Sequence, residues 1–219
     1  MSHRSEEKER RRREREEQEE VARRAAARKR TFQIGGGVIG VLVLAAIIAV
    51  VLLGGGKDDG DSVNDDTVAA SAKAAGCTYQ THKIEGDTHV GDKVNYKTNP
   101  PTSGNHNPTP AADGIYRAGN SPPKENFVHT LEHGRIEFQY KPGSPAADVA
   151  KLRALAEEPL EGTGGYHTVL FENNTKMPVQ FAATAWGKSI TCSTLSPRAL
   201  TAMRDFRKAF TDKAPEFIP

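Results

Sequence analysis

The sequence contains only two cysteines and lacks the short motifs of two large enzyme classes. No G-x-S-x-G sequence occurs, so the nucleophile turn of the α/β-hydrolases is absent. The glycine-rich stretch at residues 162–165 lacks the Lys and the following Ser or Thr of a phosphate-binding loop, and it is typical of a turn. These absences exclude an α/β-hydrolase mechanism and nucleotide binding through a P-loop.

Apolar residues are almost absent before Val21. Residues 5–30 mix Glu and Arg, so i,i+4 charge pairs favour a helix although no face of it can be buried. Residues 1–30 contain 12 Lys/Arg and 8 Asp/Glu, which gives a net charge of +4. The Glu residues interleaved around Arg10–Arg13 cancel most of the field that phosphate binding needs. We therefore expect a charged, solvated tail at residues 1–33 and no nucleic-acid partner.

Charge is absent from Ile34–Leu53. At a rise of about 1.5 Å per residue, a helix of this length covers the roughly 30 Å hydrocarbon core of a bilayer. The sequence thus predicts a single transmembrane helix, with the lipid bilayer as its partner. Cleavage as a signal peptide at Ala70-Ser71-Ala72 is the alternative, but the apolar run is too long and this site lies too far beyond it.

Basic residues near the two ends of this run predict its orientation. Those that precede it are Arg15, Arg23, Arg24, Arg28, Lys29 and Arg30, and those that follow are Lys57 and Lys73. The excess on the N-terminal side places the N-terminus in the cytoplasm and the C-terminal domain outside it, at the cell membrane. The Gly- and Asp-rich composition that follows predicts a flexible acidic linker at residues 54–75.

Residues 76–219 carry the patterns of an α+β domain with a mostly antiparallel sheet and two C-terminal amphipathic helices. Strands are expected at residues 80–85, 93–97 and 136–140, and a hairpin is expected from residues 166–171 and 179–185 around Asn173-Asn174. A long Pro-, Asn- and Gly-rich loop occupies residues 96–123. The helices are predicted to begin at Ser144-Pro145 and at Ser196-Pro197.

The two cysteines, Cys77 and Cys192, flank most of this domain. Both lie on the extracytoplasmic side of the predicted anchor, where oxidation is permitted. We therefore predict a Cys77–Cys192 disulfide.

The candidate functional site is a set of histidines that could bind a metal ion. His106 lies in a loop stiffened by Pro100 and Pro101, while His129 and His133 flank Glu132 in the sequence His-Thr-Leu-Glu-His. On a helix the two imidazoles four residues apart can share a metal ion, whereas on a strand they lie about 13 Å apart. Local signals favour a short helical turn. We predict His106, His129 and His133 as metal ligands, with His89, Glu132 and Met177 as further candidates.

The sequence from His129 to His133 also fits the H-x-x-E-H pattern of inverted zinc peptidases, in which Glu132 would be a general base. The predicted helix is short, and no acidic third ligand is evident. A zinc-dependent hydrolase is therefore the weakest of the functional hypotheses.

Three motifs together resemble the bacterial domain of unknown function family 3105, typically a membrane-anchored protein with this domain outside. They are Asn99–His106, Val128–Gly134 and Ala183–Gly187, and the resemblance covers about residues 76–219. It implies that His106, His129 and His133 lie in the signature motifs, and it assigns no activity. Asn105 stands where the family resemblance implies proline, which would loosen the loop that carries His106.

The leading hypothesis is a membrane-tethered extracytoplasmic domain that binds copper or zinc through histidine. The alternative is a structural or interaction module, in which the histidines hydrogen-bond the long loop to the sheet and the domain docks an envelope or membrane protein. We expect metal affinity to fall as the pH drops through about 6.5, because imidazole must be neutral to bind.

Overall fold

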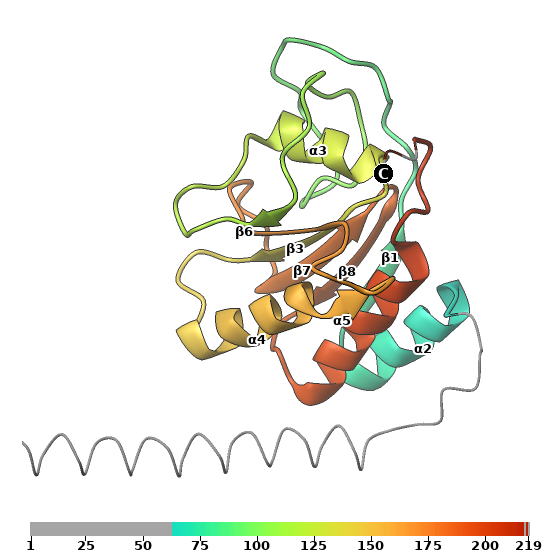
Figure 1. Ribbon diagram of the computed structural model, residues 1–219, viewed down its shortest axis with the longest axis vertical. Helices are drawn as coiled ribbons and strands as arrows, with labels where there is room; N and C mark the ends of the chain where they lie inside the picture. The colour runs from blue at the N-terminus through green and yellow to red at the C-terminus, as the bar shows by residue number, and fades with distance from the viewer. Residues whose placement is uncertain (1–62, 217, 219) are drawn as a thin grey trace, which may run out of the picture. The chain divides into compact units, whose positions relative to one another are not determined.

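The computed structural model describes residues 63–216 and residue 218. The elements in chain order are α2 (Asp65–Ala75), β1 (Thr78–Thr81), β2 (Gly114–Ile115), α3 (Lys124–Glu132), β3 (Ile136–Tyr140), α4 (Ala146–Glu157), β4 (Pro159–Leu160), β5 (Thr163–Gly164), β6 (Thr168–Glu172), β7 (Phe181–Ala185), β8 (Lys188–Cys192) and α5 (Pro197–Phe210). Figure 1 shows one sheet with helices on both of its faces. The predicted α+β class is confirmed.

Six strands form this sheet in the order β1-β8-β7-β3-β6-β2. β1, β8, β7 and β3 pair antiparallel, whereas β6 pairs parallel with both β3 and β2. The sheet is therefore mixed rather than mostly antiparallel. The β3–β6 pair is parallel because a crossover through α4 returns the chain to the edge of β3, as parallel neighbours require.

The predicted hairpin around Asn173-Asn174 is wrong, because β3 lies between β6 and β7. Asn173 is instead buried, and its side-chain amide donates to Gln139 Oε1 (2.7 Å). The hairpin of this region joins β7 to β8, and its turn contains Gly187 in a left-handed conformation (φ 69°). The strand predicted at residues 80–85 begins earlier and ends at Thr81, and the one predicted at residues 93–97 does not form.

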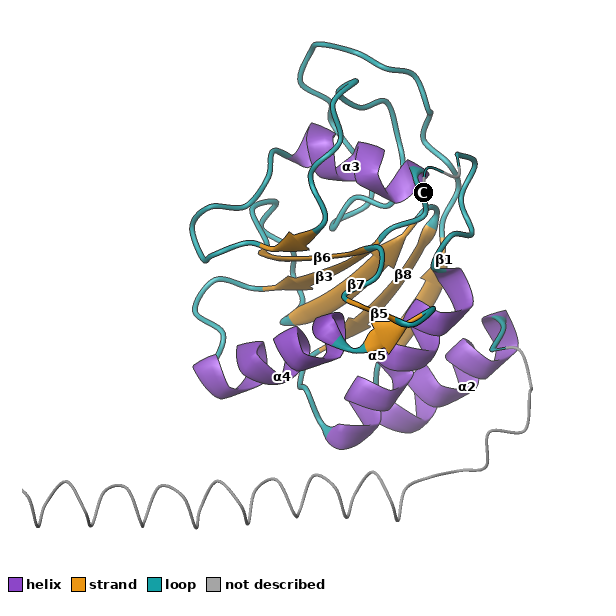
Figure 2. Cartoon of the chain, in the orientation of Figure 1, coloured by secondary structure: helices purple, strands orange, loops and turns teal. Residues whose placement is uncertain are grey.

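Alternation along β3 separates the two faces of the sheet. Ile136, Phe138 and Tyr140 join the larger core beneath α2, α4 and α5, as period-2 patterning predicts. The opposite face lies under α3, where Phe127, Val128 and Leu131 pack with Val169, Phe171 and Trp186 in a second core. Figure 2 shows α3 and the long loops on this second side.

Helix α2 occupies part of the predicted flexible linker, so that prediction is wrong for residues 65–75. Asn64 caps the helix by accepting from the Thr67 amide, and Val68 and Ala72 are buried in the larger core. The Ala-rich sequence is a good helix former once α5 covers its apolar stripe. The folded unit thus begins before Cys77.

The two C-terminal helices form as predicted, with different starts. Ser196 caps α5 by accepting from the Ala199 amide, and Met203 is buried in the core. Helix α4 begins at Ala146, one residue later than predicted, so its N-cap is Pro145, which has no side-chain acceptor, and Ser144 donates to the Lys141 carbonyl.

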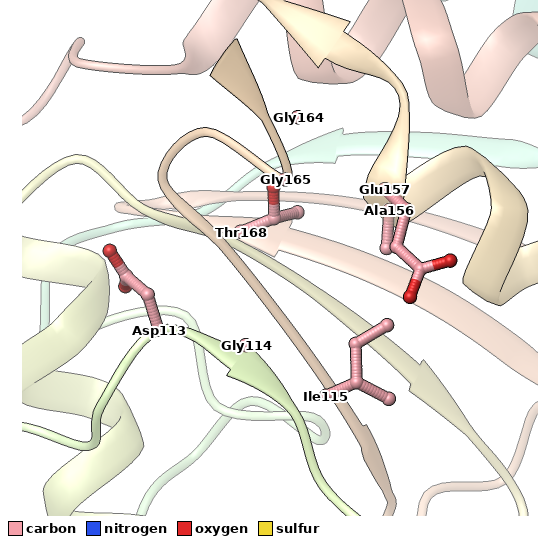
Figure 3. A pocket seen from close by; sticks show the side chains of 8 residues that line it. All are labelled: Asp113, Gly114, Ile115, Ala156, Glu157, Gly164, Gly165 and Thr168. Atoms are coloured by element: carbon pink, nitrogen blue, oxygen red, sulfur yellow. The ribbon is translucent and has the colours of Figure 1, made fainter.

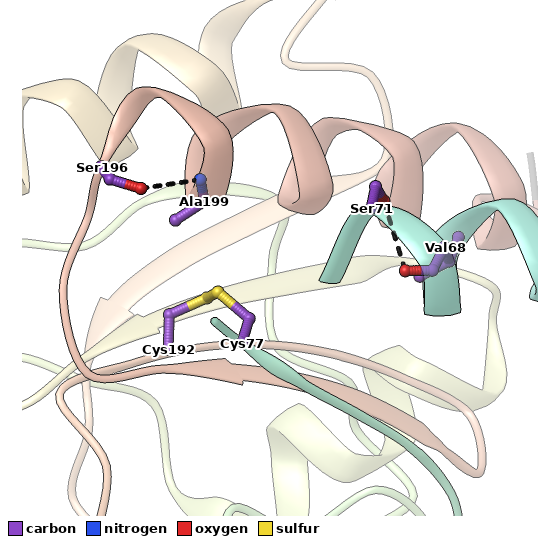
Figure 4. Close-up of a disulfide and its surroundings, with 6 residues drawn as sticks. All are labelled: Val68, Ser71, Cys77, Cys192, Ser196 and Ala199. Carbon is purple, nitrogen blue, oxygen red and sulfur yellow. Dashed lines mark hydrogen bonds between the residues drawn. A yellow bond between two sulfur atoms is a disulfide. The ribbon is translucent and has the colours of Figure 1, made fainter. Parts of the chain in front are cut away.

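The predicted Cys77–Cys192 disulfide is confirmed, with a Cα–Cα distance of 4.5 Å. It joins the residue before β1 to the last residue of β8, beneath the helical layer (Figure 4).

The predicted membrane helix, Ile34–Leu53, lies outside the described residues, as does the charged tail. Within residues 63–216, none of the helices has the length and apolar character that crossing a membrane requires.

Candidate metal centre

Four histidines and Glu132 gather on the α3 side of the sheet. His89 and His106 come from the long loop between β1 and β2, His129 and Glu132 from the second half of α3, and His133 from its C-cap. Neighbouring ring centroids in this group lie 4.4 to 4.9 Å apart. The structure thus brings together five of the six predicted ligands.

A local backbone pairing holds the two loop histidines. The Val90 amide donates to the His106 carbonyl (2.7 Å), and the His106 amide donates to the Thr88 carbonyl (3.1 Å). These bonds make His89 and His106 neighbours in a parallel bridge. A long loop can therefore place two imidazoles without a regular strand.

Helix α3 sets the spacing of the other two histidines, His129 and His133. The His133 amide donates to the His129 carbonyl (3.3 Å), so residues four apart lie on one face. Gly134 then ends the helix with a positive φ of 78°. The predicted helical turn is confirmed, and the strand alternative is wrong.

The loop before His106 is built to hold its ring. Gly104 has φ 130°, and a Cβ there would lie 2.8 Å from the Tyr96 ring, so no larger residue fits. The Tyr96 hydroxyl donates to the Asn105 carbonyl (2.8 Å), while Asn105 Oδ1 accepts from the Thr88 amide (3.2 Å). Asn105 therefore fastens the loop instead of loosening it, and His106 is fully buried.

Backbone carbonyls fix the tautomers of the two buried histidines. His106 Nδ1 lies 2.8 Å from the Gly104 carbonyl, and His129 Nδ1 lies 2.7 Å from the Asn107 carbonyl. A carbonyl oxygen only accepts, so each Nδ1 carries the proton. Each Nε2 then presents a lone pair, which is the usual arrangement of a metal-bound histidine.

His106 Nε2 faces a carboxylate. It lies 3.0 Å from Glu132 Oε2, yet this buried nitrogen has no hydrogen-bond partner of suitable geometry. With Nδ1 protonated, both facing atoms are acceptors when Glu132 is ionised. Two buried lone pairs in contact require a proton or a cation between them.

Burial shifts the ionisation of these groups toward their neutral forms. It raises the pKa of Glu132 to about 7 and lowers the pKa of His129 to about 4. Burial also lowers the pKa of His106 and of His133. The imidazoles of His106, His129 and His133 are therefore neutral at pH 7, as metal binding requires.

Two sets of donor atoms are close enough to hold an ion. The first, which we call the inner centre, is His89, His106, His129 and Glu132; the second, the outer position, is His129, His133 and Glu216. In each set the donor atoms lie within 4.8 Å of one another. Tetrahedral ligand atoms bonded to one ion at about 2.1 Å lie about 3.4 Å apart, so a pair of donors at the 4.8 Å limit must close by about 1.4 Å.

Glu216 was not predicted from the sequence as a metal ligand. It lies near the C-terminus, and its backbone amide donates to the Glu132 carbonyl (3.1 Å). Its Oε2 is 3.5 Å from His133 Nε2. No local motif signals this contact, which the folding of the chain end onto α3 creates.

Met177 is the predicted ligand that comes neither from the loop of His89 and His106 nor from α3. It is buried in the loop after β6, and Asn174 of the same loop donates to the Pro122 carbonyl, next to the start of α3. The inner centre uses the end of that helix. Ligation by Met177 therefore stays a prediction.

A separate hollow of about 350 Å³ lies beside the edge strand β2 and the end of α4. Asp113 and Glu157 stand on opposite sides of it, and Thr168 lies between them (Figure 3). Asp113 pairs with Arg135, and Glu157 pairs with Arg153. None of the residues that line this hollow is a histidine, so the candidate centre lies elsewhere.

Comparison with known proteins gives one match. The model of a family described as "Protein of unknown function (DUF3105)" matches residues 88–217, a span that contains every residue of the two donor sets. Neither the curated proteins nor the solved structures contain a match to this chain. The family match covers more than half of the chain and agrees with the motif resemblance around His106 and His129. The chain therefore belongs to the DUF3105 family of proteins of unknown function.

Proposed function

We propose that this protein binds a divalent transition metal, Cu(II) or Zn(II), at the inner centre formed by His89, His106, His129 and Glu132. The observation that carries the proposal is the buried His106 Nε2, which faces Glu132 Oε2 at 3.0 Å without a hydrogen-bond partner. A metal ion would satisfy both lone pairs at once.

The donor set suits these two metals. Imidazole nitrogen is a favoured ligand of both zinc and copper, and one carboxylate adds a negative charge. His89 is exposed whereas the other three ligands are buried, so the inner centre lies close to the protein surface. This arrangement supports a role in metal handling. Together with the anchor proposed at residues 34–53, it would place the bound ion at the outer face of the cell membrane.

The position of Glu132 does not favour the zinc-peptidase hypothesis. A general base must stand free beside a metal-bound water. Here the carboxylate is nearly buried and lies against His106, among the candidate ligands. We therefore assign Glu132 to metal binding.

Titration of the full-length chain in detergent with Cu(II) and with Zn(II) tests the proposal. Trp186 is the only tryptophan, and its ring centroid lies 6.1 Å from that of His106. Bound Cu(II) should therefore quench its fluorescence at a stoichiometry of one ion per chain. Zn(II) is followed by calorimetry. Failure of both metals to bind more tightly than about 100 μM would refute the proposal.

A matched pair of variants at one position separates ligation from structure. In His129→Asn the side-chain amide replaces Nδ1–H and keeps the bond to the Asn107 carbonyl, but Nε2 is lost. We expect this variant to fold normally and to bind metal at least about 100-fold more weakly. His82→Asn is the control, because His82 contacts Ser189 outside both donor sets.

The same contacts support a second candidate function, the structural or interaction module. His106 and His129 tie the long loop to itself and to α3, so they could serve stability alone while the domain docks an envelope or membrane partner. In that case His129→Ala destabilises the metal-free protein, His129→Asn does not, and wild-type protein binds no metal. Retained metal binding by the wild type and its loss in His129→Asn supports the first function.

Metal affinity should fall as the pH is lowered, and the pKa of Glu132 should set the pH at which it begins to fall. The metal and the proton compete for the Glu132 carboxylate, whose pKa burial raises to about 7. Metal affinity is thus at its full value above pH 7, and below pH 7 it weakens by at least about tenfold for each pH unit. Protonation of His129 steepens the loss near pH 4. Zn(II) calorimetry at pH 8, 7, 6 and 5 measures this, and Glu132→Gln should remove the step at about 7. A wild-type curve that is flat between pH 8 and 6 would contradict the assignment of Glu132 as a ligand.

A further inference from the structure

We infer that the metal ion reaches the inner centre by way of the outer position of His129, His133 and Glu216, with His129 as the ligand common to both. This inference rests on the proposed metal binding and adds an order of events to it. The two donor sets share a single residue, and that residue offers a single atom.

The shared atom is His129 Nε2. Its Nδ1 is bound to the Asn107 carbonyl, so the ring cannot bridge two ions through both nitrogens. An ion at the outer position and an ion at the inner centre therefore compete for the same lone pair. The two sets are alternative positions of one ion rather than a two-metal site.

Apart from His89, which is exposed, the ligands become less exposed from the outer position to the inner centre. The side chain of Glu216 is 48% exposed and that of His133 is 12% exposed, against 4% for Glu132 and 0% for His106. The rings of His133, His129 and His106 follow one another at centroid distances of 4.4 and 4.6 Å. An ion can thus exchange His133 and Glu216 for His106 and Glu132 without leaving His129.

The C-terminal segment holds the outer carboxylate at this place. The Asp212 amide donates to the Gly134 carbonyl (2.9 Å), and the Glu216 amide donates to the Glu132 carbonyl (3.1 Å). Figure 1 shows the chain end returning beside the end of α3. The backbone of Glu216 is therefore fixed while its side chain remains half in solvent, as capture of an ion from solution requires.

The kinetics of Cu(II) binding to the full-length chain in detergent, followed by Trp186 fluorescence, test this order. Glu216→Gln keeps the shape of the side chain and removes its charge and most of its affinity for metal. We expect both the association rate and the rate of release to a chelator to fall about tenfold, with the dissociation constant within about twofold of wild type. Equal slowing of both rates is the mark of a residue that acts only in transit.

Asp87→Asn is the control for electrostatic attraction. Asp87 is exposed, its charge influences Glu132, and it belongs to neither donor set. We expect it to slow association by no more than about twofold and to leave release unchanged. If Asp87→Asn slows association as much as Glu216→Gln does, the effect of Glu216 is general electrostatic attraction, and the inference is overturned.

Two further results would also overturn it. Unchanged rates in Glu216→Gln mean that the ion enters elsewhere, from the exposed His89 side. Loss of affinity with an unchanged association rate means that Glu216 is a ligand of the final site. Both leave the proposed metal binding intact, whereas absence of binding to the wild-type protein removes the two proposals together.

Discussion

Replacement of both cysteines, Cys77→Ala with Cys192→Ala, is expected to lower the free energy of unfolding by about 6 kcal/mol. The disulfide closes a loop with a sequence separation of 115 residues. In the chain-entropy model, a closed loop of about 100 residues restricts the unfolded chain by about 4.7 kcal/mol. This is the largest effect on stability that we expect from any single covalent change in the described residues.

The folded state should change little. The bridge lies at the end of the β1–β8 ladder, where Thr78 already pairs with Thr191. Cys192 is buried in the larger core, so its truncation removes one sulfur and adds about 1 kcal/mol of lost packing. The main loss therefore comes from the greater freedom of the unfolded chain.

Urea unfolding of the full-length chain, oxidised and reduced, measures this effect. Dithiothreitol should lower the midpoint for the wild-type protein and leave the double alanine variant unchanged. The slope of the transition should rise for the reduced protein, because an uncrosslinked chain exposes more surface. A wild-type midpoint that is indifferent to reduction, with the bridge shown to be reduced, would contradict the prediction.

Elements whose signal is local could be predicted from the sequence. The alternation in Ile136–Tyr140, the cap at Ser196 and the helical spacing of His129 and His133 all depend on residues a few positions apart. Each of them is found in the structure. The Cys77–Cys192 pairing was also predictable, because only one internal pairing of two cysteines exists.

Elements that depend on distant partners could not be predicted. Helix α2 is Asp- and Ala-rich and resembles a linker until α5 covers Val68 and Ala72. Small side chains such as Ser189 give β8 a weak strand pattern, although most of its positions are buried. The parallel pairing of β3 with β6 depends on the path of the chain through α4, which no local motif encodes.

The candidate site shows the same division. Motifs singled out His106, His129 and His133, and their grouping follows from the α3 helix and the paired loop. His89 and Glu132 were weaker candidates that the structure places among the donors, and ligation by Met177 stays a prediction. Glu216 became visible only in the fold, because its partner His133 is far away in the sequence.

Glu137→Gln is expected to stabilise the protein by about 2 kcal/mol at pH 7 and to have little effect near pH 4. Glu137 lies in the central strand β3 and is fully buried. Its Oε2 accepts from Thr184 Oγ1 (3.2 Å) and from Gln139 Nε2 (3.3 Å), while Oε1 has no partner. Burial therefore raises the pKa of this carboxyl well above its usual range.

The sign of the effect follows from this shift. A carboxyl whose pKa is raised by folding contributes most stability below its unfolded pKa of about 4.5, and this contribution is lost as the pH rises. Above pH 4.5 the unfolded chain releases its proton while burial resists ionisation of the folded carboxyl, so the wild-type protein loses up to about 1.4 kcal/mol of stability per pH unit. Glutamine keeps the acceptor for Thr184 and Gln139 and removes this cost, apart from the loss at its unpartnered amide.

Urea unfolding of the wild-type and variant chains at pH 4, 5.5, 7 and 8 tests this expectation, with Glu157→Gln on the exposed surface of α4 as the matched control. The difference between Glu137→Gln and wild type should grow with pH, and the control should show no such trend. An equal difference at every pH would show that Glu137 is ionised in the folded state. Because Glu137 belongs to neither donor set, its substitution should leave metal affinity unchanged. A gain in stability without a change in metal affinity would thus show that Glu137 and the inner centre act independently, although both lie on the α3 side of the sheet.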